Sequence, residues 1–251
     1  MHSLADAIDH VVIGTPDLEA ARAEFMELGF QVTPHGVHEK FGTDNYLVIL
    51  KDSYIELLGM TGRPAESRAS LDILEPCTAA GGGVPMLALT ADDMEAAYQR
   101  LRALGVRAKE PVFWSRPADT PDGPRTASFT TMFLDGPLLP SLSAFYCKHH
   151  TVEFVRHPVW RRQENGASRL HGLIRRSSVD LRAARGRREY LGEARSCDDG
   201  IDVVLGGHYL AYRPDTGAPR TEIHLAVCGD GREVRHNLHS VGGVSVVLER
   251  A

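Results

Sequence analysis

The chain has few cysteines and no long apolar run. Its four cysteines among 251 residues are scattered and form no CxxC pair, so the sequence predicts neither a zinc knuckle nor a disulfide framework. The longest apolar runs, such as residues 46–50, are far too short to span a bilayer. The start, MHSLADAIDH, lacks the basic and apolar regions of a signal peptide. We therefore expect a cytoplasmic protein with no membrane partner.

The sequence also lacks an excess of positive charge. Its formal net charge of −5 at pH 7 gives no overall attraction to nucleic acid, so we expect no nucleic-acid partner. Arginines are locally dense in one segment, 175–188, where we expect a solvated helix face with some interface role. The hydrophobic fraction of 43% and the charged fraction of 24% are ordinary for a globular protein.

What the chain does contain is a repeat. An Asp is followed by a helical stretch rich in Ala and Arg, and then by a Gly at the same distance. The copies are DLEAARAEFMELG at 17–29, DMEAAYQRLRALG at 93–105 and DLRAARGRREYLG at 180–192. Asp is a favoured helix N-cap and Gly a favoured helix stop, and each copy follows a short apolar stretch of strand type. Each copy therefore predicts a strand followed by a helix.

Further extended stretches complete these units. In the first unit we expect strands at 30–33, 45–50 and 53–59. In the second we expect strands at 84–90, 126–134 and 142–149, with Pro-rich turns at 116–124 and 136–140. In the third, strand candidates lie at 201–205, 208–212, 222–227 and 244–249. The sequence thus predicts an α+β fold, with βαβββ modules at 1–62 and 84–155, a linker at 63–83, and a divergent third module at 156–251 packed on the first two.

One strand position breaks the repeat. When the copies are aligned on the Asp, His10 occupies a position that Met86 and Leu173 fill in the other copies. Side chains alternate along a strand, so His10 lies on an otherwise apolar face and needs a partner. The candidate is Glu56, in the middle of the apolar strand YIELL, because a buried carboxylate also needs compensation. A buried His–Glu hydrogen bond and a metal site both account for the pair.

The last strand of the second module, FYCKHHT, supplies a further candidate ligand. Matching it to YIELL places Lys148 opposite Glu56, with Tyr146 and His150 on the same face. This match favours His150 as the inward ligand, and a bulge or a slip of one residue would replace it with His149. Two imidazoles and one carboxylate with open positions suit Fe²⁺, Mn²⁺ or Zn²⁺.

The segment HEKFGTDN and the strand after it offer polar groups for a substrate. Asn45 shares a strand face with Leu47 and Ile49 and could bind a substrate oxygen, although a purely structural turn explains the segment equally well. We expect His38 to be exposed. The candidate substrate-binding residues are Asn45, Tyr54, Tyr146 and Lys148, and the candidate catalytic carboxylate is Glu56.

The motifs DHVVIGTPDLEAARAEF, FGTDN and YIELL together resemble the first module of the vicinal oxygen chelate superfamily, and most closely its glyoxalase-like domain proteins. The resemblance implies paired βαβββ modules that form a half-open eight-stranded barrel around a small-molecule cavity, with a third partial module at the C-terminus. It places His10 and Glu56 on the metal-ligand positions of that superfamily. Met86 and Lys148 stand where further ligands are expected.

The resemblance leads to two hypotheses of function. The first is an enzyme that depends on a divalent metal and acts on a small oxygenated molecule, as a lyase or isomerase or as a ring-cleaving dioxygenase; Glu56 would move a proton. The second is a metal-free protein that binds or sequesters a small molecule such as a drug, which Met86 and Lys148 favour. The resemblance also suggests a homodimer as an open alternative to a monomer.

Overall fold

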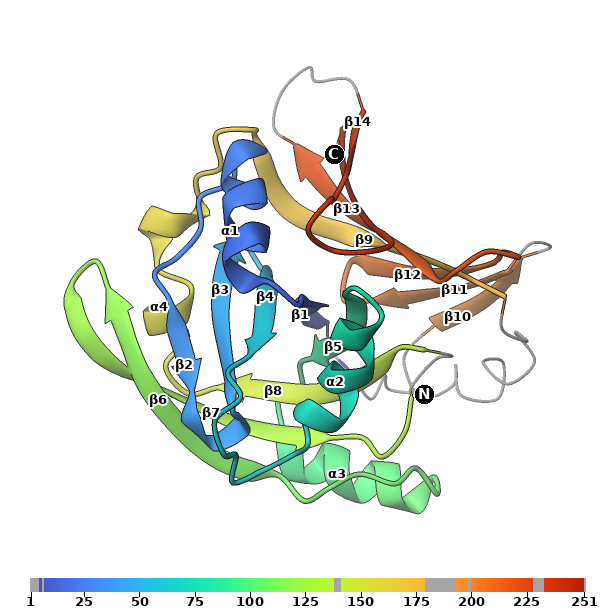
Figure 1. Ribbon diagram of the computed structural model, residues 1–251. Helices are drawn as coiled ribbons and strands as arrows, with labels where there is room; N and C mark the ends of the chain where they lie inside the picture. Colours follow the sequence, from blue (N-terminus) through green and yellow to red (C-terminus); the bar gives the residue numbers. More distant parts are fainter. Residues whose placement is uncertain are drawn as a thin grey trace.

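The computed structural model describes residue 5 and residues 7–137, 141–178, 193–197, 200–227 and 233–250. These residues form two sheets that lie side by side (Figure 1). The eight-stranded sheet has the order β2-β3-β4-β1-β5-β8-β7-β6, and the seven-stranded sheet has the order β10-β11-β12-β9-β13-β15-β14. The first sheet curls into a half-open barrel, which confirms the predicted α+β fold of paired βαβββ modules. Among the described residues, no helix is both long enough and apolar enough to cross a membrane.

The first module follows the predicted order of one strand, one helix and three strands. Its elements are β1 (Ile8–Gly14), α1 (Leu18–Glu27), β2 (Gly36–His38), a 3-10 turn η1 (Glu39–Phe41), β3 (Thr43–Ile49) and β4 (Tyr54–Met60). Asp17 caps α1, because its carboxylate accepts from the backbone N–H of Ala20. The strand predicted at 30–33 is wrong. Pairing with β3 begins only at Gly36, after Pro34, which has no N–H to give to a ladder.

The second module repeats this order. Its elements are β5 (Gly83–Leu89), α3 (Met94–Ala103), β6 (Val112–Thr120), β7 (Gly123–Phe133) and β8 (Ser143–His149). The turn predicted at 116–124 is wrong, because most of it belongs to the β6–β7 hairpin. Pro117 is tolerated there because β6 is an edge strand, where a missing N–H can face away from the ladder. The segment predicted to be a linker contains helix α2 (Leu71–Ala79).

A second sheet follows a short helix, α4 (Val152–Val155), and a 3-10 turn, η2 (Pro158–Arg161). Its strands are β9 (Ala167–Ser177), β10 (Glu193–Cys197), β11 (Gly200–Leu205), β12 (His208–Pro214), β13 (Arg220–Val227), β14 (Val234–Asn237) and β15 (Val244–Arg250). Strand β9 pairs with β12 in parallel and with β13 antiparallel, as β1 pairs with β4 and β5. The second sheet therefore contains more than one module. Strands β9 to β12 correspond to β1 to β4, and strands β13 to β15 correspond to part of a fourth module.

The arginine-rich segment does not begin as a solvated helix. Arg175 and Arg176 lie in β9, and Arg175 is only 7% exposed. That part of the prediction is wrong, because the strand turns Arg175 towards the seam between the two sheets. The helix predicted at 180–192, with the remaining arginines, lies outside the described residues.

Two apolar clusters hold these layers together. The larger joins the outer face of the barrel, including Ile8 and Val11, to α1, α3 and one face of the second sheet. The smaller lies inside the barrel and is rich in aromatic side chains, among them Phe41, Phe129 and Phe145. Alternate residues of β1 therefore serve two cores, because neighbouring side chains on a strand point to opposite faces. His10 and Val12 belong to the inner face.

Candidate functional site

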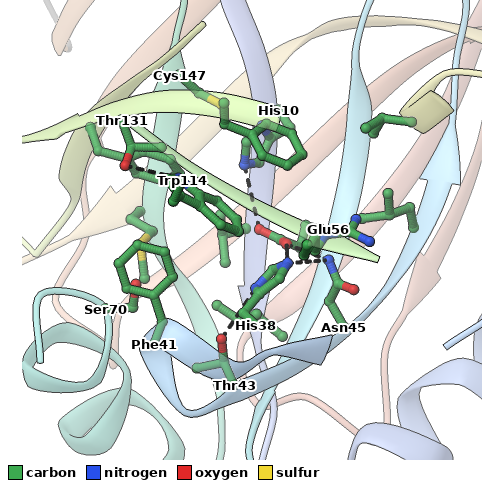
Figure 2. Close-up of a pocket in the computed structure, with 18 of the residues that line it drawn as sticks. His10, His38, Phe41, Thr43, Asn45, Glu56, Ser70, Trp114, Thr131 and Cys147 are labelled. Atoms are coloured by element: carbon green, nitrogen blue, oxygen red, sulfur yellow. Dashed lines mark hydrogen bonds and ion pairs between the residues drawn. The ribbon is translucent and has the colours of Figure 1, made fainter. Parts of the chain in front are cut away.

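The barrel encloses a cavity with about 550 Å³ of space not filled by atoms, its open mouth included (Figure 2). Most of its wall is aromatic or aliphatic, and a polar group of side chains gathers on one side. That polar group consists of His10, His38, Asn45 and Glu56. A mainly apolar pocket with a few convergent polar groups is the usual form of a small-molecule site.

The structure brings His10 and Glu56 together on the wall of this cavity. Because β1 and β4 run parallel and side by side, His10 Nε2 lies 3.4 Å from Glu56 Oε2. The two side chains are 3% and 8% exposed. Tyr54 stacks on the His10 ring with 4.2 Å between ring centroids. The imidazole and the carboxylate thus compensate each other in a buried place where either alone would be costly.

Asp9 holds the His10 ring from behind. Its Oδ2 lies 2.6 Å from His10 Nδ1, although adjacent residues of a regular strand point to opposite faces. The β1–β5 register shifts between Ile8 and His10, which leaves Asp9 without a partner on β5, as in a β-bulge. Arg156 and His149 also donate to the Asp9 carboxylate. Asp9 was not among the residues predicted from the sequence, although an acidic residue directly before His10 in an apolar strand is a visible signal.

His38 is the second imidazole of the cavity. Its Nδ1 lies 3.2 Å from Thr43 Oγ1, and its Nε2 lies 4.0 Å from Glu56 Oε1. The expectation that His38 is exposed is wrong: β2 pairs with β3 at this point and turns the ring inward. Asn45 is also inside the cavity, where its Nδ2 donates to Glu56 Oε1 over 2.7 Å.

The charges of these groups follow from burial and from their neighbours. Burial acts most strongly on His10 and would lower its pKa, but the contacts with Asp9 and Glu56 outweigh burial and raise that pKa. Burial would raise the pKa of Glu56, but His10 outweighs it and lowers that pKa to about 2. Burial, aided by Arg116, lowers the pKa of His38 to about 4 against the opposing effect of Glu56. At neutral pH the wall therefore carries an ionised Glu56 and a neutral His38.

The predicted inward face of β8 is wrong. Phe145 and Cys147 line the cavity, whereas Tyr146, Lys148 and His150 lie on the opposite face. Tyr146 is buried in the outer core, Lys148 Nζ donates to the carbonyl of Asp92, and the exposed His150 pairs with Thr130. The structure therefore places none of these three side chains in the cavity.

The strand registers explain the error. His10 pairs with Tyr54 and Val12 with Glu56 in the first module, while Met86 pairs with Ser143 and Ala88 with Phe145 in the second. Since Met86 corresponds to His10, the counterpart of Glu56 is Phe145 and not Lys148. The second module thus presents apolar side chains at both positions that correspond to the polar pair of the first.

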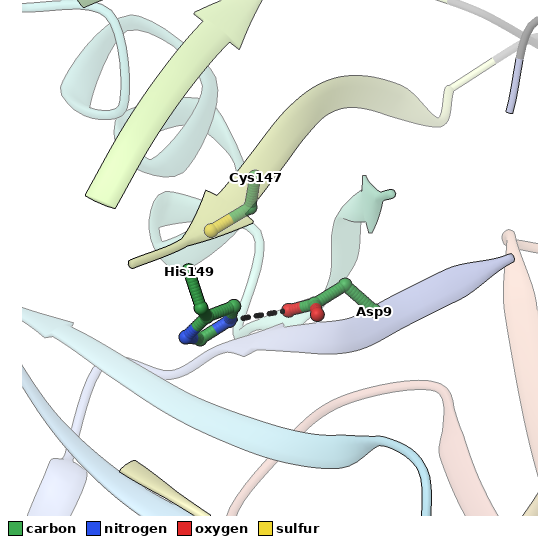
Figure 3. A group of neighbouring side chains, drawn as sticks. All are labelled: Asp9, Cys147 and His149. Carbon is green, nitrogen blue, oxygen red and sulfur yellow. Dashed lines mark hydrogen bonds and ion pairs between the residues drawn. The ribbon is translucent and has the colours of Figure 1, made fainter. Parts of the chain in front are cut away.

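His149, the alternative to His150, shares the inner face of β8. Its Nε2 contacts Asp9 Oδ2 over 3.0 Å rather than Glu56. Asp9, Cys147 and His149 form a group whose ligand atoms lie within 4.8 Å of one another (Figure 3). A cation fits this group poorly, because Asp9 already accepts hydrogen bonds from two imidazoles and is paired with Arg156. Burial also raises the pKa of the Cys147 thiol. The group is better explained as the support of His10.

His10, His38 and Glu56 form a second set of possible metal ligands, whose ligand atoms are spaced more widely than the 4.8 Å of the Asp9 group. Both imidazoles turn Nε2 towards the same carboxylate, while each Nδ1 is held from behind, by Asp9 in one case and by Thr43 in the other. Metal-ligating histidines have this arrangement, in which the second ring nitrogen is hydrogen-bonded by an outer group. Two imidazoles and one carboxylate at the edge of an open cavity also match a three-ligand site with free positions.

Two further residues of the cavity wall were not predicted from the sequence: Arg116 fell within the turn predicted at 116–124, and Trp114 lay just before it, where no strand was predicted. Trp114 and Arg116 both project inward from β6. The signal that could have revealed them is the alternation of Trp114, Arg116 and Ala118 with more exposed residues along one strand.

A comparison with family models gives a match to the glyoxalase-like domain over residues 8–190. The chain belongs to the glyoxalase-like domain family. This membership places the protein in the vicinal oxygen chelate superfamily, as the resemblance of its motifs implied. A comparison with curated proteins found no match.

A comparison with solved structures gives matches to this glyoxalase-like protein at low identity, and two of them share its fold. A hypothetical protein from Staphylococcus aureus is 15% identical, with a TM-score of 0.75 and coverage of 97% of this chain and 99% of that one. A mutant of 4-hydroxymandelate synthase from Streptomyces coelicolor is 13% identical, with a TM-score of 0.52 and coverage of 89% and 71%. Methylmalonyl-CoA epimerase from Mycobacterium tuberculosis is 21% identical, with a TM-score of 0.41 and coverage of 59% and 90%.

Proposed function

We propose that this glyoxalase-like protein is an enzyme of lyase or isomerase type, which moves a proton on a small oxygenated molecule held in the barrel cavity. We further propose that His10, His38 and Glu56 hold a divalent metal, Fe²⁺, Mn²⁺ or Zn²⁺. The observation that carries both proposals is the convergence of two buried imidazoles on one carboxylate, each ring held through its outer nitrogen.

The charge states of His38 and Glu56 support the ligand set. His38 is neutral above a pH of about 4, so its Nε2 can carry a lone pair at neutral pH, and Asn45 Nδ2 lies 3.2 Å from that nitrogen. Glu56 is ionised over the same range, and Asp9 keeps the His10 ring oriented with Nε2 towards the cavity. When bound, a metal of this kind would polarise a carbonyl or enediolate oxygen of the substrate.

The protein's own groups then account for proton movement. Asn45 holds Glu56 Oε1 in place through a 2.7 Å hydrogen bond, which orients the carboxylate at the cavity wall. That oxygen can accept a proton from a carbon next to a substrate carbonyl and return it at a neighbouring atom. The aromatic and aliphatic lining excludes water and so strengthens the electrostatic effect of the carboxylate. We favour this chemistry over ring cleavage because a positioned carboxylate is what proton transfer requires.

A metal-free binding protein is the second candidate. The observation that favours it is the apolar character of Met86 and Phe145, which correspond in the second module to His10 and Glu56. Because the second module contributes these apolar side chains to the wall, the cavity also suits a planar or aliphatic molecule that is bound without reaction. In that case the buried His10–Glu56 pair would serve structure alone.

Two measurements on the same proteins separate these candidates. The first is the metal content of protein purified without chelator and then soaked with each of the three cations. The second is the exchange of carbon-bound hydrogen for deuterium, followed by NMR, in a panel of small 2-oxo and 2-hydroxy compounds. The variants are His10→Ala, His38→Ala and Glu56→Gln, and the control is His150→Ala on the outer face of β8.

The proposal predicts about one metal ion per chain and exchange in at least one compound. All three cavity variants should lose the metal, and Glu56→Gln should lose exchange, while His150→Ala should keep both. Exchange in a protein that binds no metal would contradict the metal site, but it would support the proposal that the protein is a proton-transfer enzyme. If the protein shows no metal and no exchange but binds a compound tightly, the enzyme proposal is contradicted and the binding protein is supported.

A further inference from the structure

Arg116 lies at the junction of two hollows. It projects from the middle of β6 and lines the main cavity together with Trp114. It also lines an adjoining hollow of about 320 Å³, which His35 and Phe154 border on the other side. Asn45, Leu47 and Val155 line both hollows as well, so Arg116 belongs to the wall that the two hollows share.

The guanidinium is left with few partners. Its Nη1 donates to the backbone carbonyl of Pro117 over 3.1 Å, and its Nε is buried without any hydrogen-bond partner. Within the described ranges, no carboxylate oxygen lies within 4.0 Å of an Arg116 nitrogen. An arginine has five N–H donors in a planar fork, so most of the donors of Arg116 remain available. Its only other notable contact is with the face of the Phe129 ring, at 5.9 Å.

The other charges around the cavity are already paired. Asp9 forms an ion pair with Arg156, and Glu56 faces His10 over 3.4 Å. Arg116 is thus the one Arg or Lys of the described cavity wall, and Glu56 acts on it only from beyond 4.0 Å. A partly desolvated cation that lacks an anion is costly, and its cost is removed when an anionic ligand supplies the missing charge and acceptors.

Space beside Arg116 is preserved by a glycine. A Cβ atom on Gly36 would lie 2.1 Å from Asn45 Oδ1 and 3.4 Å from Arg116 Nη1. Gly36 therefore allows the Asn45 amide and the guanidinium to approach the same point of the wall. Since Asn45 also donates to Glu56, a group bound by Arg116 would lie next to the His10–His38–Glu56 set.

We propose that the molecule taken by this cavity carries a carboxylate, which binds the Arg116 fork while the oxygenated remainder reaches Glu56. The assignment of the reacting end rests on the proposed function; the anchoring of the carboxylate does not. A carboxylate suits the site better than a phosphate, because one planar fork matches two carboxylate oxygens and no further Arg or Lys among the described residues lines the cavity.

The test measures binding, not turnover. Isothermal titration of the protein as purified would compare matched acids and amides of increasing size: acetate and acetamide, butyrate and butyramide, benzoate and benzamide. The variants are Arg116→Gln, which removes the charge, and Arg116→Lys, which keeps it without the fork. The control is Arg125→Gln on β7, because Arg125 is exposed and, like Arg116, donates to the carbonyl of an adjacent proline.

We expect at least one acid to bind about 10- to 100-fold more tightly than its amide, and Arg116→Gln to remove that preference. Arg116→Lys should restore part of it, and Arg125→Gln should leave it unchanged. Unchanged metal content and an unchanged melting temperature in Arg116→Gln would show that the loss is local. Equal affinity for acids and amides in the parent protein, or an acid preference that survives Arg116→Gln, would overturn the proposal.

Failure of this proposal and failure of the proposed function are distinguishable. Glu56→Gln removes the proposed proton acceptor and a proposed metal ligand but leaves Arg116 in place. An acid preference that persists in a protein without metal or exchange would keep the anchor and discard the enzyme. Metal binding and exchange without an acid preference would keep the enzyme and discard the anchor.

Discussion

The carboxylate of Asp9 lies 2.6 Å from Nδ1 of His10, the residue that directly follows it in the same strand. This contact depends on the register shift in β1, which releases Asp9 from the regular alternation of faces. It allows one short segment to supply both an imidazole for the cavity and the group that orients that imidazole. Arg156, from beyond the second module, completes the arrangement by neutralising Asp9.

The Asp9–His10 contact leads to a prediction about metal affinity. Asp9→Asn keeps the size of the side chain but weakens its hold on the imidazole, so the affinity for a divalent metal should fall about 10- to 100-fold. Competition with a chelator of known affinity measures this change. Asp52→Asn is the control, because Asp52 pairs with Arg169 away from the cavity. An unchanged affinity would show that His10 is not a ligand.

Gly36 should be intolerant of a side chain. In Gly36→Ala the new Cβ would lie 2.1 Å from Asn45 Oδ1, so the Asn45 amide must move away from Glu56. We expect at least a 10-fold loss of affinity for a carboxylate ligand, equal to about 1.4 kcal/mol. Gly217→Ala is the control, since an added Cβ there would meet only Asp215 Oδ1 at an ordinary 3.6 Å. Calorimetric titration of both variants with the carboxylate ligand measures this affinity, and an equal affinity in the two variants would contradict the prediction.

The second sheet should lose stability in acid through Glu222. Burial would raise the pKa of Glu222, but ion pairs with Arg235 and Arg176 outweigh it and lower that pKa to about 2. A depressed folded-state pKa gives a stabilisation that is fully present above the unfolded value, about 4.3, and is lost as the pH falls towards 2. The free energy of unfolding in urea should therefore differ between the parent and Glu222→Gln above pH 5.

The pH series contains its own control. Other buried carboxylates titrate in both proteins and cancel in the difference, so the gap between parent and variant should close between pH 4.5 and 2. A gap of constant size across this range would mean that the variant acts through packing and not through the charge of Glu222.

Arg175 should act as a clamp between the two sheets. Its Nη1 donates to Thr221 Oγ1 over 2.6 Å within the second sheet, and its Nη2 donates to the carbonyl of Ser141, just before β8, over 3.1 Å. Arg175→Met keeps the apolar stem and removes both bonds, so the free energy of unfolding should fall by about 2–3 kcal/mol. Arg169→Met, on an exposed ion pair with Asp52, should cost less than about 1 kcal/mol. Equal losses in the two variants would contradict the clamp.

Part of the candidate site could be predicted from the sequence. His10 and Glu56 were identified because each is a polar residue in an apolar strand, and such residues must find compensation wherever they are buried. Asn45 and Tyr54 were identified from the face that they share with cavity residues. His38, Asp9 and Arg116 were not, because His38 and Arg116 lie on edge strands and Asp9 lies in a bulge, and the pattern of residues does not reveal that geometry.

The sequence by itself determined the modules of this protein. Caps such as Asp17 and Asp93, the glycines that end their helices, and the alternation along β1 and β4 act within one turn or one strand, so neighbouring residues suffice to specify them. The tertiary structure alone decided which donors meet. The register of β5 on β8 turned Phe145 and not Lys148 inward, and the pairing of β2 with β3 brought His38 to Glu56. A shift of one residue in either pairing would exchange the two faces of a strand, and no local pattern in this chain excludes that shift.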